Sequence, residues 1–410
     1  GRGTAYVGYR KMRPVLQSKR DYSACTIQSS NSDVLSCGGS LTNAQGTALF
    51  FTPASSSSTV GALGAGTLTP GVANRYNFAP LNYFQRPDER YTAGVFADYE
   101  ISDAIHPYME FMFMDDQTLA QIAPSGNFGN TLTINCDNPL MSAAQRTLIC
   151  NPSNLINGNL GTFPLAVGAG YNPNPGNAPL TFTDPASGLP YNKAFFQVLR
   201  RNVEGGARVS DLQHTAFRTV IGSRGELGKA WSYDAYYQYG RTNYSQVYSN
   251  EFSIARLTNA LDVVTSPTTG LPVCRVTAAG GDPNCVPYDI FGGTPSAASL
   301  GYVTTSGFIK GRTTQQVLSA SITGTLGEYG FQTPWAADGV DVAFGAEYRK
   351  DTLQLQADYA FNTGDLTGQG APTKDTSGSY NVSELFGEIS IPLVSDSFFT
   401  ALTLNGAYRY

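Results

Sequence analysis

Hydrophobic and polar residues alternate along the closing segment of the chain. In "SELFGEISIPLV", Leu385, Ile389 and Ile391 fall on one parity, while Glu384 and Glu388 fall on the other. After a short polar break the alternation resumes in "ALTLNGAYRY". Because successive side chains of a strand point to opposite faces, this pattern predicts two strands joined by a tight turn, each with one apolar and one polar face.

The same alternation recurs in seven earlier segments, so that the pattern predicts about nine strands. These segments are "TAYVGYRKM", "ERYTAGVFADYEIS", "YMEFMFMDDQ", "FFQVLRRNVEGGARVSDLQHTAFRTVIGSRGE", "AWSYDAYYQYGRTNYSQVYS", "QVLSASITGTLG" and "VDVAFGAEYRKDTLQLQADYAF". The fourth of them is long enough to be either one very long strand or two strands with an interruption.

The connections between these segments alternate in length. Three are only a few residues long and "GEYGFQTPWAADG" is modestly longer, whereas most of the others run to about 50 residues or more. Loops without structure beyond about 15 residues are uncommon in compact domains. Outer-membrane barrels, in contrast, have short turns at one end and long loops at the other. The asymmetry therefore favours a membrane barrel over a soluble sandwich.

The composition is compatible with a membrane protein that crosses the bilayer with strands. Charged residues make up only 14% of the chain, and no run of 18 apolar residues occurs, which excludes a helical membrane protein. Alternating strands average to near-neutral hydropathy, as observed here at −0.18. A sandwich whose apolar faces pack together is the alternative. Ala and Gly recur on both faces, as in "AGVFADY", which favours lipid contact over a core of Val and Leu.

For the closing hairpin, this interpretation assigns each face an environment. The residues expected to face acyl chains are Leu385, Ile389, Ile391, Leu402 and Leu404, and those expected in a polar lumen are Glu384, Glu388 and Arg409.

Six cysteines form three neighbouring pairs in the long connections: Cys25 with Cys37, Cys136 with Cys150, and Cys274 with Cys285. Zinc sites favour closer cysteine spacing with histidines nearby, but the chain has only two histidines. We therefore expect three local disulfides formed in an oxidising compartment, with free or metal-binding thiols as the alternative.

No segment of the sequence predicts a catalytic site, a cofactor or a nucleic-acid interface. The adjacent Asp115 and Asp116 lack the further oxygen ligands that Ca²⁺ requires, so a solvated strand end is the preferred interpretation. His214 is a candidate substrate ligand, although a polar lumen residue is favoured. The basic residues are scattered singly, without the clusters that bind nucleic acid. We therefore expect a protein that is not an enzyme and has no cofactor.

Four segments, in this order along the chain, resemble TonB-dependent outer-membrane receptors, and most closely the large, long-looped proteobacterial subgroup. They are "FQRPDERYTAGVFADYEIS", "NCVPYDIFGG" with "SAASLGYV", "VAFGAEYRKD" and "SELFGEISIPLV". The resemblance implies an all-β fold, with about nine antiparallel transmembrane strands belonging to a barrel of 22 strands that has long extracellular loops.

The same resemblance implies a function, a location and partners. Receptors of this family lie in the outer membrane of Gram-negative bacteria and take up scarce, bulky nutrients such as siderophores, cobalamin-like compounds or oligosaccharides. Their partners are the outer-membrane lipid, the ligand, and the TonB–ExbB–ExbD complex, which engages a TonB box ahead of an N-terminal plug. Neither plug nor TonB box is recognisable in residues 1–410, which we expect to be part of a barrel domain that continues on both sides.

Two other functions fit the pattern without the resemblance. A passive porin or structural outer-membrane barrel would have the same strands without a plug or energy coupling. A soluble, secreted β-sandwich adhesin would bury the apolar faces in a protein core.

Overall fold

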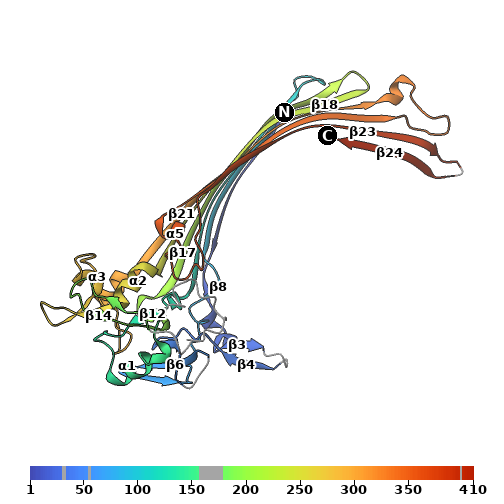
Figure 1. The fold of residues 1–410 in the computed structure, drawn as a ribbon. Helices are drawn as coiled ribbons and strands as arrows, with labels where there is room; N and C mark the ends of the chain where they lie inside the picture. The colour runs from blue at the N-terminus through green and yellow to red at the C-terminus, as the bar shows by residue number, and fades with distance from the viewer. Residues whose placement is uncertain (30–33, 54–56, 157–178, 398) are drawn as a thin grey trace.

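One large antiparallel sheet dominates the structure (Figure 1). The computed structural model describes residues 1–29, 34–53, 57–156, 179–397 and 399–410, and within them nine long strands form this sheet. The strands are β1 (Arg2–Met12), β9 (Asp88–Asp98), β10 (His106–Pro124), β17 (Ala207–Leu227), β18 (Trp231–Phe252), β21 (Thr304–Thr325), β22 (Asp341–Ala357), β23 (Thr376–Ser395) and β24 (Ala401–Arg409). Their order in the sheet is their order in the chain, and β1 and β24 are the two outer strands. The prediction of long antiparallel strands is confirmed, whereas the described sheet does not close into a barrel.

Several predicted strands have other bounds in the structure; β21, for example, begins at Thr304, twelve residues before the predicted segment "QVLSASITGTLG". The segment that begins "FFQVLRR" forms two strands, which was one of its two predicted alternatives, and the first of these, β16 (Gln197–Arg201), pairs with strands outside the large sheet. Strand β22 ends at Ala357, because Asp358 begins the short helix α5 (Tyr359–Thr363). The Asp358 side chain accepts a hydrogen bond from the backbone N–H of Phe361 at 2.9 Å, which is the bond expected of a helix N-cap.

The short and long connections lie at opposite ends of the sheet, as the sequence predicts. Gly228–Ala230 joins β17 to β18, and residues 99–105, 326–340 and 396–400 make the other connections at the same end. The long connections are residues 13–87, 125–206, 253–303 and 358–375. We call their described residues the cap, which lies at the lower left of Figure 1.

The cap has secondary structure of its own, although the sequence predicts only irregular loops there. Its largest sheet in the described part has the order β11-β16-β5-β6-β7 and combines strands of the first two long connections. The elements are β11 (Gly126–Phe128), β5 (Thr47–Phe50), β6 (Thr59–Gly64), β7 (Thr67–Pro70) and the helices α1 (Ala143–Ile149), α2 (Ile254–Leu261), α3 (Arg275–Ala278) and α4 (Ala297–Val303). Two-stranded ladders surround them, among them β3 (Thr26–Ser29) with β4 (Leu35–Gly38) and β12 (Thr133–Asn135) with β15 (Lys193–Phe195).

The largest hydrophobic core among the described residues lies in the cap, and a smaller one joins Tyr248 and Ile309 of the large sheet to α5. The buried side chains of the larger core come mainly from the first three long connections and include Phe50, Ile149, Phe196, Leu257 and Phe291. The ring centroids of Phe196 and Phe291 lie 5.8 Å apart. Each of these segments is too short for a repeating hydrophobic pattern, and its contacts are with residues far away in the chain. Hydrophobic periodicity in the sequence therefore does not reveal this core.

One buried amide joins three parts of this core. Gln145 closes a capping box at the start of α1, because its backbone N–H donates to Ser142 Oγ and its side chain accepts from the Ser142 N–H. The Gln145 Nε2 then donates to the backbone oxygens of Thr67 at 3.1 Å and Phe291 at 3.2 Å, in the first and third long connections. The side chain is fully buried, so these bonds have no water to replace them.

Replacing Gln145 with Leu is expected to destabilise the cap, because the buried bonds from the Gln145 amide to the carbonyl oxygens of Thr67 and Phe291 are lost, and Phe291 O keeps only its bond from the Gly66 N–H. The expected loss in the free energy of cap unfolding is on the order of 1–3 kcal/mol, measured by pulse proteolysis in urea. The exposed Thr147→Ala change on the same helix is the control and is expected to alter stability by less than about 0.5 kcal/mol. Equal effects of the two changes would contradict the proposed role of Gln145.

Candidate functional site

The register of the large sheet places every side chain on one of two faces, because residues paired across antiparallel strands point to the same side. One row of paired residues defines the polar face: Tyr6, Gly94, Met112, Arg218, Gly240, Gln315, Asp351 and Tyr380. A second row defines the apolar face: Gly3, Ala97, Met109, Ile221, Tyr237, Leu318, Tyr348 and Ser383.

Large hydrophobic side chains of the apolar face are exposed on all nine strands. Ile221, Leu318 and Leu385 are 60%, 56% and 65% exposed, respectively. Other exposed members of this face are Val7, Val95, Met109, Tyr237, Phe344 and Leu404. Single exposed hydrophobic residues are normal on protein surfaces, but a continuous patch of this extent marks a contact with another apolar phase or protein. We call this patch the apolar belt.

The edge of the apolar belt toward the cap is displaced between β9 and β22, although not evenly. The first charged residue of the apolar face is Glu89 on β9, Asp115 on β10, Asp211 on β17, Arg241 on β18, Arg312 on β21 and Lys350 on β22, and in register Asp211 and Arg312 lie closer to the cap than their neighbours do. Traced from strand to strand through the paired residues, Lys350 lies level with Val95 of β9. Val95 is six residues further along β9 than Glu89 is. With a strand spacing of about 4.8 Å and a rise of about 3.4 Å per residue, this shift over five neighbouring strand pairs corresponds to a tilt of roughly 40° between the strands and the normal to the belt.

The polar face carries ion pairs that join neighbouring strands. At its cap end, Arg10 contacts Asp88 at 2.5 Å and Arg90 contacts Asp116 at 2.9 Å. In the middle of the sheet Arg218 contacts Glu110 at 2.8 Å. Near the outer strand β24, Arg409 contacts Glu384 at 2.5 Å, so the two residues share one face of the sheet, as the alternation predicts. Partly exposed ion pairs of this kind each contribute little to stability. Their importance here is that they identify this face of the sheet as the polar one.

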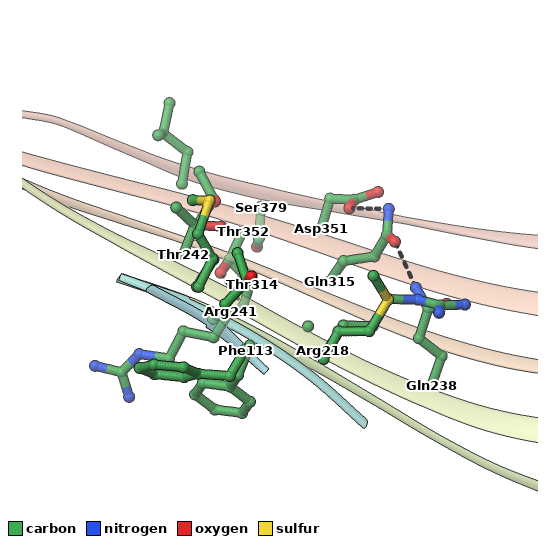
Figure 2. A pocket seen from close by; sticks show the side chains of 18 of the residues that line it. Phe113, Arg218, Gln238, Arg241, Thr242, Thr314, Gln315, Asp351, Thr352 and Ser379 are labelled. Atoms are coloured by element: carbon green, nitrogen blue, oxygen red, sulfur yellow. Dashed lines mark hydrogen bonds between the residues drawn. The ribbon is translucent and has the colours of Figure 1, made fainter. Parts of the chain in front are cut away.

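A hollow of about 990 Å³ lies on the polar face, at the middle of the sheet (Figure 2). Side chains on successive strands form a chain of hydrogen bonds along it, which we call the polar ladder. Arg218 Nε donates to Gln238 Oε1 at 2.8 Å, Gln238 Nε2 donates to Gln315 Oε1 at 2.8 Å, and Gln315 Nε2 donates to Asp351 Oδ1 at 3.0 Å. Figure 2 shows Gln238, Gln315 and Asp351 lying in one line across their strands. The hollow is the candidate ligand site of this chain.

The structure separates the two aspartates considered as a cation site. Asp116 lies on the polar face with Arg90, whereas Asp115 lies on the apolar face, where Thr215 Oγ1 donates to its carboxylate at 2.6 Å. Consecutive strand residues point to opposite faces, so the pair does not converge on one ion.

His214 lies on the polar face and stacks on Tyr244 with ring centroids 5.0 Å apart. Among the described residues, no group of three His, Cys, Asp or Glu side chains is arranged to hold a metal ion.

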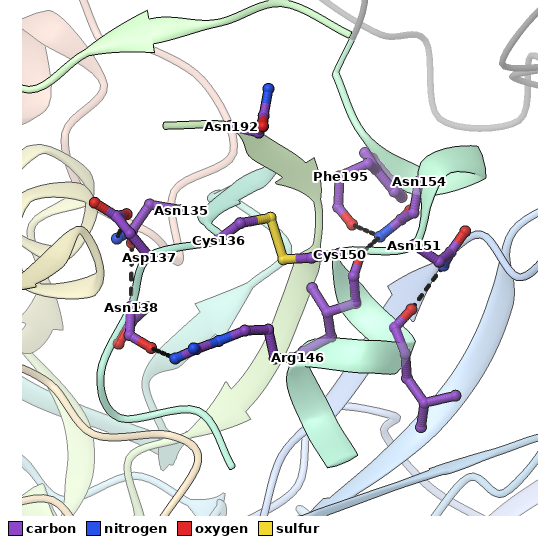
Figure 3. The surroundings of a disulfide bond; sticks show 12 residues. Asn135, Cys136, Asp137, Asn138, Arg146, Cys150, Asn151, Asn154, Asn192 and Phe195 are labelled. Atoms are coloured by element: carbon purple, nitrogen blue, oxygen red, sulfur yellow. Dashed lines mark hydrogen bonds between the residues drawn. A yellow bond between two sulfur atoms is a disulfide. The ribbon is translucent and has the colours of Figure 1, made fainter. Parts of the chain in front are cut away.

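All six cysteines lie in the described part of the cap and form disulfides in three pairs, Cys25–Cys37, Cys136–Cys150 and Cys274–Cys285. The first closes the hairpin of β3 and β4. The second ties the segment after β12 to the end of α1, beside Arg146 and a group of asparagines (Figure 3). The third is buried in the cap core.

Charged side chains inside the cap join the second long connection to the third. The Arg275 guanidinium contacts Asp137 at 2.7 Å, Asp184 at 2.9 Å and Asp262 at 2.9 Å, and it stacks on Tyr191. Burial alone lowers the pKa of Arg275, but the carboxylates of Asp137 and Asp262 raise it by more, so the net pKa lies above its ordinary value. Arg275 is therefore a fixed cation that holds the two connections together.

A buried carboxylate ties the cap to the large sheet. Glu251 lies near the end of β18 and is fully buried. It accepts hydrogen bonds from Ser125 Oγ at 2.5 Å and from Thr367 Oγ1 at 3.1 Å, in the second and fourth long connections. Arg208 of β17 contacts it at 3.5 Å and supplies the opposite charge that a buried carboxylate needs.

Comparison with solved structures shows a distant likeness to an import receptor. No family model matches the chain, and no curated protein sequence matches it. Among solved structures, the ferric-catecholate import receptor Fiu from E. coli K12, in an open form, is similar over 79% of this chain with 12% identity and a TM-score of 0.32. The match covers 36% of that receptor, so the chain spans about a third of its length. No described helix has the length and apolar character needed to cross a membrane.

Sequence reasoning did not find the polar ladder. Its members are ordinary polar residues, and Gln238 and Gln315 are 77 positions apart. The alternation assigns each of them to a polar face, but only the register between strands brings them into one line. The lengths of the connections do not specify that register.

The three disulfides are expected to be reduced in the order of their accessibility. Cys37 is exposed, whereas Cys274 is fully buried. Attack by an external thiol requires access to a sulfur atom, so Cys25–Cys37 is expected to be reduced first and Cys274–Cys285 last. Timed alkylation in dithiothreitol followed by peptide mapping measures the order, and mapping without reductant is expected to recover the three local linkages. Linkages between different long connections, or reduction of Cys274–Cys285 before Cys25–Cys37, would contradict this arrangement.

Proposed function

We propose that this chain forms part of the barrel of an outer-membrane receptor in a Gram-negative bacterium, and that the receptor takes up a scarce, bulky nutrient with energy supplied through TonB. The observation that carries the proposal is the apolar belt on one face of all nine described strands. Burying apolar surface gains about 25 cal/mol per Å², so a belt of this extent in water would be strongly unfavourable. Contact of the apolar belt with acyl chains instead of water removes this unfavourable free energy.

The inclination of the apolar belt supports a membrane rather than another protein as its partner. Between Glu89 on β9 and Lys350 on β22 its edge moves by six residues over five strand pairs, which corresponds to a net tilt of roughly 40°. Strands of outer-membrane barrels are tilted by about 35–45° to the membrane normal. A soluble sandwich would instead need a second sheet over these side chains, and in the described part of the chain no second sheet of comparable size is found.

The open edges of the sheet support a larger barrel. Strands β1 and β24 each have one unpaired side within the described residues. Unpaired backbone groups in lipid cost several kcal/mol each, so the sheet is stable there only if further strands pair with both edges. In the proposed receptor, residues 1–410 belong to a barrel of 22 strands that surrounds a plug, and the TonB box precedes that plug. The polar face then lines the lumen.

The cap fits the outer side of such a receptor. Its disulfides require an oxidising environment, which the cell surface provides. The turns at the other end of the strands are short, as periplasmic turns are in this class of barrel. A ligand arriving from outside would meet the cap first and the polar face next.

Replacing Leu318 with Arg is expected to prevent stable insertion, whereas the same change at the next residue, Ser319, is expected to be tolerated. Leu318 lies in the apolar belt and Ser319 on the polar face of the same strand. An arginine at the bilayer midplane costs about 2–4 kcal/mol, and near zero in a polar lumen. Fractionation of cells, heat-modifiable migration in gels and urea unfolding in lipid measure the difference.

Equal tolerance of both arginines, or recovery of the full-length protein in the soluble fraction, would contradict a membrane role. These results would instead favour a secreted protein whose apolar belt binds another protein.

Energy coupling needs its own test. The full-length receptor is expected to bind the purified periplasmic domain of TonB and to bind it more strongly when ligand is present. Surface plasmon resonance on receptor in nanodiscs measures this. A membrane-inserted protein that binds no TonB under any condition would be a passive porin or a structural barrel, which is the alternative function.

A further inference from the structure

The polar ladder has unused hydrogen-bonding capacity that faces the hollow. Each glutamine side chain offers two N–H donors and two acceptor lone pairs. In Gln238 and Gln315, one donor and one lone pair are used within the polar ladder. Each amide therefore keeps one donor and one acceptor, side by side, for a ligand. Groups that both donate and accept, such as hydroxyls, match this arrangement best.

The charges around the hollow are balanced. On the polar face, Arg218 contacts Glu110 at 2.8 Å and Arg349 contacts Asp351 at 3.5 Å, whereas Arg241, which also borders the hollow, belongs to the apolar face and donates to Asn243 Oδ1. The next row toward the cap consists of uncharged residues: Gly8, Thr92, Met114, Ala216, Thr242, Thr313, Leu353 and Gly378. An anionic ligand, such as an iron chelate with several negative charges, would be desolvated here without a free cation to compensate it.

Apolar side chains gather around the polar ladder on the same face. Tyr6, Met112, Leu353 and Tyr380 line the hollow and are exposed. Between them, Gly240 has no side chain, which leaves its backbone surface open to a ligand, whereas the ring of Tyr6 covers the backbone at Gly94. The hollow thus combines apolar contacts with a line of amides, and that combination suits a ligand that has both C–H faces and hydroxyl groups.

We propose that the hollow binds a neutral, hydroxyl-rich ligand of the saccharide class, extended across the strands along the polar ladder. This proposal rests on the proposed function, in which the polar face lines a lumen. The polar ladder runs from Arg218 on β17 to Asp351 on β22, which is three strand spacings or about 14 Å. Several sugar rings in a row have room along it.

Binding is tested with the full-length protein in detergent on a printed array of neutral and acidic glycans. Isothermal titration with the best neutral glycan follows, and the ferric complex of 2,3-dihydroxybenzoate serves as the anionic probe. The expected result is binding to neutral glycans and none to the ferric complex. Binding only to acidic glycans or to the ferric complex, or to no glycan at all, would overturn the proposal.

A matched pair of variants ties the binding to the polar ladder. Gln315→Leu removes the central amide of the polar ladder and is expected to weaken glycan binding at least ten-fold. Gln316→Leu makes the same change one residue later, on the apolar face, and is expected to leave binding unchanged. Both variants are expected to keep the heat-modifiable migration of the parent protein. Equal affinities of the two variants would place the glycan elsewhere and overturn the proposal.

The proposal on the ligand class and the proposed function can be rejected independently of each other. Loss of insertion in Leu318→Arg but not in Ser319→Arg, together with a glycan array without binding, would reject only the ligand class. A soluble protein that binds glycans would reject the membrane receptor while keeping the binding site.

Discussion

The backbone pairing of nine long strands determines two environments at once. Because the side chains of a strand alternate, a fixed register sends every second residue to the same face over the whole sheet. A slip of one residue between β18 and β21 would move Leu318 to the charged face and Asp351 to the apolar belt, relative to Ile221 and Arg218 on β17. The ion pairs and the polar ladder therefore depend on the same register that builds the apolar belt. The proposed lipid contact and the proposed ligand site have one structural cause.

The protein divides its stabilising interactions between two regions. In the cap, aromatic and aliphatic side chains from three long connections form a buried core, and Arg275 and three disulfides add links between and within the connections. In the large sheet, backbone pairing dominates, and the apolar face has no protein core behind it in the described part. Glu251 connects the two regions through the second and fourth long connections. Because the first three long connections share one core, they are expected to unfold together rather than as separate loops.

The sequence predicted the sheet better than the cap, for a physical reason. Strands such as β9 and β23 repeat their alternation over many residues, so the exposed positions of Val95 and Leu385 follow from the pattern alone. Cap segments are short, and a residue such as Gln145 acquires its role only from carbonyl groups far away in the chain. The same limit applies to the site: the parity of Gln315 was predictable, but its partners were not, because they are set by register.

The most direct test of the account is a spin-label scan along β22 in the full-length protein reconstituted in lipid. Nitroxides at successive positions from Val342 to Leu353 report their access to oxygen, which concentrates in acyl chains, and to a polar nickel chelate. The account predicts a period of two, with high oxygen access at Phe344, Ala346 and Tyr348 that gives way to nickel access from Lys350 onward. Uniform nickel access along the strand, or a period of two with the opposite phase, would contradict the claim that the apolar belt faces lipid.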